Sequence, residues 1–280
     1  WIANIINIVL DPLLIFGWGP IPAMGIQGAA VATNIGRGIG VIIQLWTLVK
    51  GGKHIQTRIS QLYLDAKVML NIVKTSLGGV GQMIVAMTSW IFLMRILSDV
   101  GSEAVAGATI AIRIMMFTMM PAWGFSNAAA TLVGQNLGAG HPDRAEASVW
   151  KIGACNMVFL VGVAIVFYFN SYSLVNIFSD DDRVIAIGGE WLQIISYSYF
   201  VYGWWMVSVQ AFNGAGDTRT PTMINLVFFW FIQIPLSYFL AIHLGWEHSG
   251  VFWGVFFSET SVGLFTLWLF SRGGWKKAVV

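Results

Sequence analysis

The most regular feature of this sequence is a series of long apolar runs separated by short polar stretches. A helix needs about 20 apolar residues to cross a lipid bilayer, and most of the runs reach that length. They predict eight membrane helices, over residues 1–16, 26–49, 67–97, 104–135, 149–170, 185–212, 222–242 and 250–271. The first run is short, and the sequence opens inside it without a Met. We therefore expect further helices to precede it in the complete protein.

The composition supports an all-α integral membrane fold. Hydrophobic residues make up 57% of the 280 residues and charged residues only 10%, whereas about 25% charged residues is typical of soluble domains. The net charge of +2 arises from charges scattered among short loops, so we expect no nucleic-acid partner. Cys155 is the single cysteine and lies in an apolar run, which excludes an internal disulfide.

Lysine and arginine concentrate in alternate loops. The stretch 50–67 and the C-terminal tail are rich in both, whereas the loop 98–103 carries only acids and 171–184 carries three aspartates in a row. Cytoplasmic loops are enriched in Lys and Arg. The chain is therefore predicted to be a multi-pass protein of the cell inner (plasma) membrane, with its C-terminus in the cytoplasm.

Two segments of the chain, residues 12–46 and 235–268, suggest an internal repeat. The matched positions, each 222 residues apart, are Gly28 with Gly250, Ala32 with Gly254, and Trp46 with Trp268. A repeat of this length holds six helices. The pattern predicts the last two helices of an N-terminal lobe at 1–49, a cytoplasmic linker at 50–66 and a complete six-helix lobe at 67–280. Transporters place a central binding site between two such lobes.

Three strings identify a family resemblance that covers essentially the whole chain. "NIVLDPLLIFGWGPIPAMGIQGAAVAT" at 7–33, "ATIAIRIMMFTMMPAWGFSNAAATLVGQNLGAG" at 108–140 and "QAFNGAGDTRTP" at 210–221 resemble the multidrug and toxic compound extrusion (MATE) family. The resemblance implies twelve helices in two lobes, of which this chain holds helices five to twelve. It also implies efflux of amphipathic, often cationic xenobiotics by antiport with Na⁺ or H⁺, with no other cofactor.

Asn7 and Asp11 are the strongest candidates for a cation-coupling site. They are four residues apart and share a helix face, and a carboxylate within a membrane is a functional candidate by default. It can carry a proton or, with an amide oxygen, ligate Na⁺. Asp11 could also simply end a helix near the outer surface. The resemblance implies a cation site at Asn7 and Asp11, with Thr33 beside them and an acid on the family's first helix. Arg37, on the polar stripe with Thr33, would oppose cation binding if it lay close.

Other polar residues inside predicted helices are candidates for a substrate path or an internal ion pair. Glu259 occupies the repeat position equivalent to Arg37 and needs a partner, for which Arg113 is one possibility. Some family members carry acids on their seventh and tenth helices. The corresponding stretches here hold Gln82 and Tyr202 instead, which leaves cation coupling to the N-terminal lobe.

Two side-chain patterns mark the third and fourth segments. Thr75, Gln82 and Ser89 recur every seven residues and form one polar face. Methionines follow on the same two helices, and flexible thioethers suit a promiscuous apolar pocket, although methionines that simply face lipid or pack in the core are the commoner case. These residues are Met83, Met87, Met94, Met115, Met116, Met119 and Met120.

Three functions remain open at this point. The first is an antiporter, expected to act as a monomer on small-molecule substrates within the bilayer. The second is a lipid-linked oligosaccharide flippase of the same superfamily, for which Arg37 and Arg113 would bind pyrophosphate. The third, a membrane enzyme, is disfavoured. The consecutive acids 180–182 do not share one helix face, and all four histidines fall in predicted loops.

Overall fold

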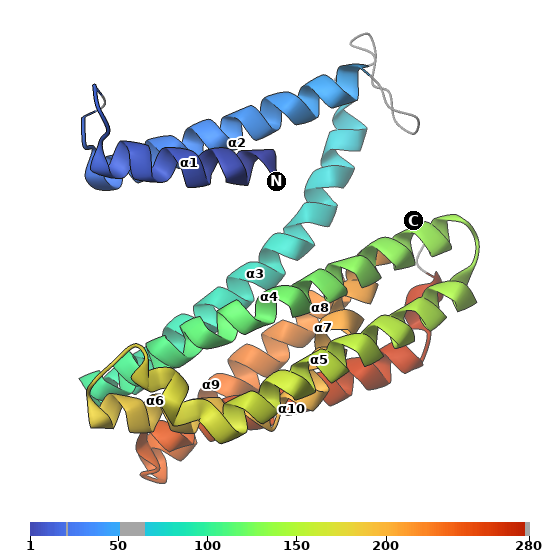
Figure 1. The fold of residues 1–280 in the computed structure, drawn as a ribbon. Coiled ribbons are helices and arrows are strands. Elements are labelled where there is room, and N and C mark those ends of the chain that lie inside the picture. Colours follow the sequence, from blue (N-terminus) through green and yellow to red (C-terminus); the bar gives the residue numbers. More distant parts are fainter. Residues whose placement is uncertain (21, 51–64, 278–280) are drawn as a thin grey trace. The chain divides into compact units, whose positions relative to one another are not determined.

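The computed structural model describes residues 1–20, 22–50 and 65–277, and its elements are helices (Figure 1). The chain divides into two compact units, Trp1–Met69 and Leu70–Val280. The predicted linker at 50–66 lies almost wholly outside the described residues, so its role stays a prediction.

The first unit is built on a helical hairpin of α1 (Ile2–Phe16) and α2 (Gly25–Lys50). The buried residues of α2 are Gly28, Ala32 and Gly36, spaced four apart on one face. A Cβ atom on Gly28 would collide with the Leu14 carbonyl, and one on Gly36 would lie 2.8 Å from the Ala3 carbonyl oxygen. Small residues at this spacing let two helix backbones approach closely. The seam therefore sets which side chains of α1 and α2 meet.

The second unit is a bundle of longer helices. They are α3 (Ala66–Val100), α4 (Ser102–Gly138), α5 (Pro142–Asn176), α6 (Asp182–Ser196), α7 (Tyr199–Gly214), α8 (Arg219–Asn225), α9 (Ile234–Tyr238) and α10 (Glu247–Ser271). A π-helical stretch, η2 (Leu226–Gln233), connects α8 with α9, and a second one, η3 (Phe239–His243), follows α9, so that together they form one continuous span. A 3₁₀ turn, η4 (Gly274–Lys277), follows α10. The π-helical turns flank Pro235, which lacks an N–H and removes one hydrogen bond from the helical ladder.

The described helices include six that are long and apolar enough to cross a membrane. The predicted helix at 185–212 is instead two helices, α6 and α7, bent by 64°. At the bend the hydroxyls of Ser196 and Ser198 donate to the carbonyls of Gln193 and Ile195, a backbone bonding typical of bent helices. Counting the bent pair as one span gives seven, and α1 is a shorter apolar helix. The predicted count of eight spans is therefore not confirmed, whereas the eight segments and the all-α class are present in the described residues.

The main core of the second unit is formed by α3, α4, α5, α6, α7 and α10. Leu93 and Leu97 of α3, Trp191 of α6 and Phe252 of α10 are among its buried side chains. At Gly107 of α4 an added Cβ would lie 2.9 Å from the Gly188 nitrogen and 2.9 Å from the Val184 oxygen. Only a residue without a side chain allows α4 and α6 to approach this closely. This contact fixes the two helices relative to each other beside the cavities described next.

Candidate functional site

The hairpin of the first unit brings the three predicted coupling residues together. The Asn7 amide nitrogen lies 3.3 Å from the Thr33 hydroxyl oxygen. Rotating that amide by 180° lets its nitrogen donate to Asp11 Oδ2 at 3.0 Å and its oxygen accept from the Thr33 backbone N–H at 3.2 Å. All three residues are half-buried. The carboxylate can take up a proton, and together the carboxylate, amide and hydroxyl oxygens offer the hard ligands that Na⁺ prefers.

The orientation of the Asn7 amide depends on what Asp11 carries. An ionised carboxylate only accepts hydrogen bonds, so the amide N–H must face it, as in the rotated orientation. A protonated Asp11 donates instead, and a bound cation also attracts the amide oxygen.

Arg37 stands apart from this cluster. Its side chain is exposed, and the described part of the chain gives it no ion pair with Asp11 or with any other acid. The predicted complication, an arginine opposing the cation at Asp11, therefore has no direct contact to support it.

The second unit contains a cavity of about 480 Å³ between α3, α4, α7 and α10. We call it the Met-rich cavity. Its described lining residues are Met87, Trp90, Ile91, Met94, Ile112, Met115, Met116, Met119, Trp123, Tyr202 and Glu259. Five of the seven methionines singled out in the sequence line it, whereas Met83 and Met120 do not. The methionine pattern therefore marks a cavity wall rather than ordinary packing alone.

Glu259 is the one carboxylate among the described lining residues. It is only 7% exposed, and its Oε2 has no hydrogen-bond partner. Tyr202 lines the same cavity, with its ring centroid 4.9 Å from that of Trp205. An ionised carboxylate in such surroundings is destabilised unless it is paired, so a proton or a cationic group in the cavity would stabilise Glu259.

The predicted ion pair between Glu259 and Arg113 is not present. Arg113 points into a different groove, between α4 and α5, and forms no ion pair among the described residues. The two residues lie on helices that both belong to the core, but each lines a different cavity. The sequence could not show this because it does not specify how α4 is rotated about its axis.

Gln82 serves to join helices and does not line the Met-rich cavity. Its amide nitrogen donates to Asn213 Oδ1 at 3.0 Å and to the Thr218 carbonyl at 3.2 Å. Ser89, seven residues further along α3, behaves alike and donates to the Gln233 side chain, whereas Thr75 takes part through its backbone carbonyl, which accepts from the Thr218 hydroxyl. The polar face predicted for α3 is real, and it is a seam between helices.

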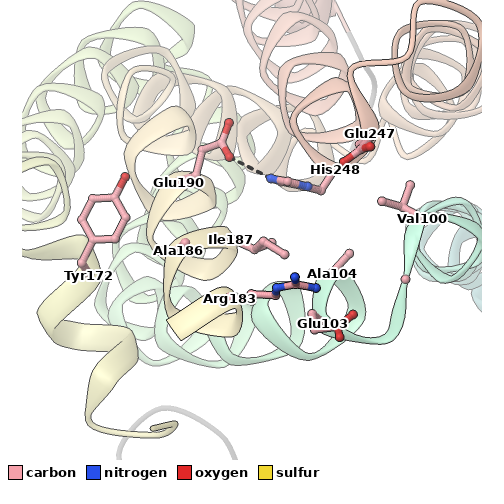
Figure 2. A pocket seen from close by; sticks show the side chains of 11 residues that line it. Val100, Glu103, Ala104, Tyr172, Arg183, Ala186, Ile187, Glu190, Glu247 and His248 are labelled. Atoms are coloured by element: carbon pink, nitrogen blue, oxygen red, sulfur yellow. Dashed lines mark hydrogen bonds and ion pairs between the residues drawn. The ribbon is translucent and has the colours of Figure 1, made fainter. Parts of the chain in front are cut away.

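A second cavity, of about 490 Å³, lies near the start of α10 and is lined by polar side chains (Figure 2). Glu190 accepts from the Ser249 hydroxyl at 2.6 Å and lies 3.1 Å from His248 Nε2. Figure 2 shows Glu190 and His248 pointing toward one another across the space between α6 and α10. The sequence predicts a loop at His248 and does not predict this pair. A carboxylate inside the apolar segment 185–212 was the signal that could have found it.

A family model described as MatE matches residues 79–239, which is more than half of the chain. The chain belongs to the MatE family. A probable multidrug resistance protein NorM of Thermotoga maritima is 27% identical over 279 residues, covering 100% of this chain and 60% of that protein. The FAD transporter of Shewanella oneidensis is 27% identical over 239 residues, covering 84% of this chain and 52% of that protein.

The fold agrees with MATE transporters of known structure. The crystal structure of the Vibrio cholerae MATE transporter VcmN in the bent form superposes with a TM-score of 0.84 at 21% identity, covering 97% of this chain and 60% of that one. The chain spans about 60% of the length of the curated relatives that it matches. These matches confirm the resemblance and the multi-pass membrane class. Because the MatE relatives are transporters, they also agree with the prediction that the chain is not an enzyme.

Proposed function

We propose that the complete protein is a secondary antiporter that exports amphipathic, often cationic compounds in exchange for Na⁺ or H⁺. The observation that carries this proposal is the Met-rich cavity, with its unpaired Glu259 carboxylate. MatE membership and the multidrug resistance names of relatives point to the same activity.

The lining of the Met-rich cavity suits lipophilic cations of varied shape. Methionine side chains adapt to different apolar outlines because they are unbranched and polarisable. Trp90 and Trp123 offer ring faces, which attract cations by about 0.5–2 kcal/mol each. Glu259 supplies a negative charge that a cationic substrate neutralises on binding.

The coupling step is assigned to Asp11. When Asp11 is ionised, the Asn7 amide N–H donates to it. When a proton or Na⁺ arrives, the amide turns its oxygen toward Asp11, and Thr33 can contribute its hydroxyl. Pro12 follows directly, and its ring prevents one backbone hydrogen bond inside α1. Because this hydrogen bond is missing, α1 can bend at Pro12 as the charge at Asp11 changes.

The flippase alternative is less well supported. Pyrophosphate recognition would need basic side chains facing a common cavity, and the described lining of the Met-rich cavity contains none. Arg113 faces a separate groove, and Arg37 belongs to the other unit.

The test is Asp11→Asn in the full-length transporter, assayed by drug efflux from cells and by substrate binding to the purified protein. We expect cation-driven efflux to be abolished while substrate binding is largely retained, because Asn cannot exchange a proton or balance Na⁺. Asp180→Asn, the same change in an exposed loop, should export normally. If Asp11→Asn exports as well as wild type under the same Na⁺ and H⁺ gradients, Asp11 is only a helix-end residue.

A further inference from the structure

A large apolar groove runs along the hairpin of α4 and α5. Its volume is about 900 Å³, within the range of ligand sites in proteins. We call it the Arg113 groove. Its described lining is apolar except for Arg113 and Thr118. The Thr118 hydroxyl already donates to the carbonyls of Met115, at 2.9 Å, and Ile114, at 3.3 Å. Arg113 is therefore the one polar side chain of this lining that still needs a partner.

Arg113 lies about midway along the described lining of the groove, which extends from Val158 to Phe178. The antiparallel hairpin sets Arg113 opposite Phe167, a lining residue of the same groove. Tyr168, the next residue on α5, packs against Tyr197 with ring centroids 5.9 Å apart, and tyrosine is enriched where hydrocarbon meets lipid headgroups. Side chains of a helix lean toward its N-terminus, so the guanidinium of Arg113 is directed toward the end of the hairpin where α4 begins.

The inner part of the groove has room for a hydrocarbon chain. Val158, Phe159, Gly162 and Val163 form its wall, and Val158 lies nine residues, or about 14 Å, from Phe167 along α5. A Cβ atom added at Gly162 would meet nothing within 4 Å. The groove therefore combines an apolar channel with one cation, and no acid among its described lining residues neutralises that cation.

We infer that the Arg113 groove binds an anionic phospholipid from the surrounding bilayer. One acyl chain lies along the wall between Phe167 and Val158, and the phosphate accepts hydrogen bonds from the Arg113 guanidinium. A guanidinium matches a phosphate with two parallel hydrogen bonds. The same contact supplies the counter-charge that an arginine in a membrane helix requires. This lipid is a bound component of the fold and not the exported substrate.

The headgroup is tested with the full-length transporter in nanodiscs of equal phosphatidylglycerol and phosphatidylcholine, released for native mass spectrometry. Wild type should retain phosphatidylglycerol in preference to phosphatidylcholine. Arg113→Gln should lower that preference by about tenfold, the effect expected for one lost charge-assisted hydrogen bond, and Arg113→Lys should keep part of it. Lys151→Gln removes an exposed charge elsewhere on α5 and should change nothing. An unchanged preference in Arg113→Gln, or an equal loss in Lys151→Gln, overturns the inference.

The chain position is tested separately by Gly162→Leu, which fills the open space while Arg113 stays intact. Retention of both lipids should fall, whereas Gly79→Leu, at another helical glycine with open space, should retain them. Normal lipid retention in Gly162→Leu, combined with lost drug binding, would make the groove a substrate site and overturn the lipid assignment. The lipid readouts do not depend on Asp11, so a failure of the lipid assignment leaves the proposed antiport untouched.

Discussion

Neutralising Glu259 is the most direct probe of the Met-rich cavity. Glu259→Gln keeps the shape of the side chain and removes only its charge. A contact with a charged group contributes roughly 1.5–3 kcal/mol, and about 1.4 kcal/mol corresponds to a tenfold change in Kd. A cationic ligand should therefore bind about 10- to 150-fold more weakly to the variant.

Two features of the structure affect the size of this loss of affinity. Glu259 is only 7% exposed and no described lining residue is basic, so water and neighbouring cations screen it little. Several other lining residues are exposed, however, including Met87 at 55% and Met116 at 54%. The cavity is thus partly open. The full Coulomb energy of about 4 kcal/mol for charges about 4 Å apart at an effective dielectric of 20 is therefore an upper bound.

The assay is equilibrium binding of a fluorescent quaternary ammonium compound and of its uncharged isostere to the purified full-length protein. The cation should lose affinity in Glu259→Gln, and the isostere should not. Asp99→Asn, which neutralises an exposed acid on α3 that pairs with Arg95, serves as the matched control. An equal loss for both ligands would show that Glu259 shapes the cavity without acting through its charge. No loss for either would remove Glu259 from the binding site.

Three further predictions address the fold and its orientation. Gly107→Val should destabilise the second unit by roughly 1–3 kcal/mol, because the added side chain meets the backbone of Gly188 and Val184; thermal unfolding in detergent measures the loss, and an unchanged midpoint would contradict the close α4–α6 contact. Hydrogen bonds to Glu146 and Asp143 raise the pKa of Lys276 above its ordinary value of 10.5. The charged lysine therefore anchors the C-terminal turn fully at pH values below 10.5, and this anchor is lost as the pH rises through the raised pKa. A change in the quenching of Trp275 fluorescence over that pH range should report the release of the turn. Lys276→Met should show no such transition. In a Cys155→Ser background, an impermeant thiol reagent added outside cells should label a cysteine at position 181 but not one at position 144, and the reverse pattern would invert the predicted topology.

The sequence by itself determined the class of the protein and most of its elements. Apolar runs of membrane-spanning length cannot be hidden in a soluble fold, so they indicate the membrane class and most helix positions whatever the tertiary arrangement. The runs at 26–49, 67–97, 104–135, 222–242 and 250–271 agree with helices to within a few residues. The methionine pattern and the four-residue spacing of Asn7 and Asp11 were also readable, because helical periodicity places such residues on one face.

Tertiary structure alone decided which polar residues share a site. The sequence left Gln82, Arg113 and Glu259 as one group, but packing assigns Gln82 to a seam between helices, Arg113 to a groove and Glu259 to the Met-rich cavity. The break between α6 and α7, and the contact of Glu190 with His248, were equally hidden. Each depends on the rotation of a helix about its axis and on its neighbours. Hydropathy cannot specify that rotation, because lipid-facing and core-facing residues of a membrane helix are both apolar.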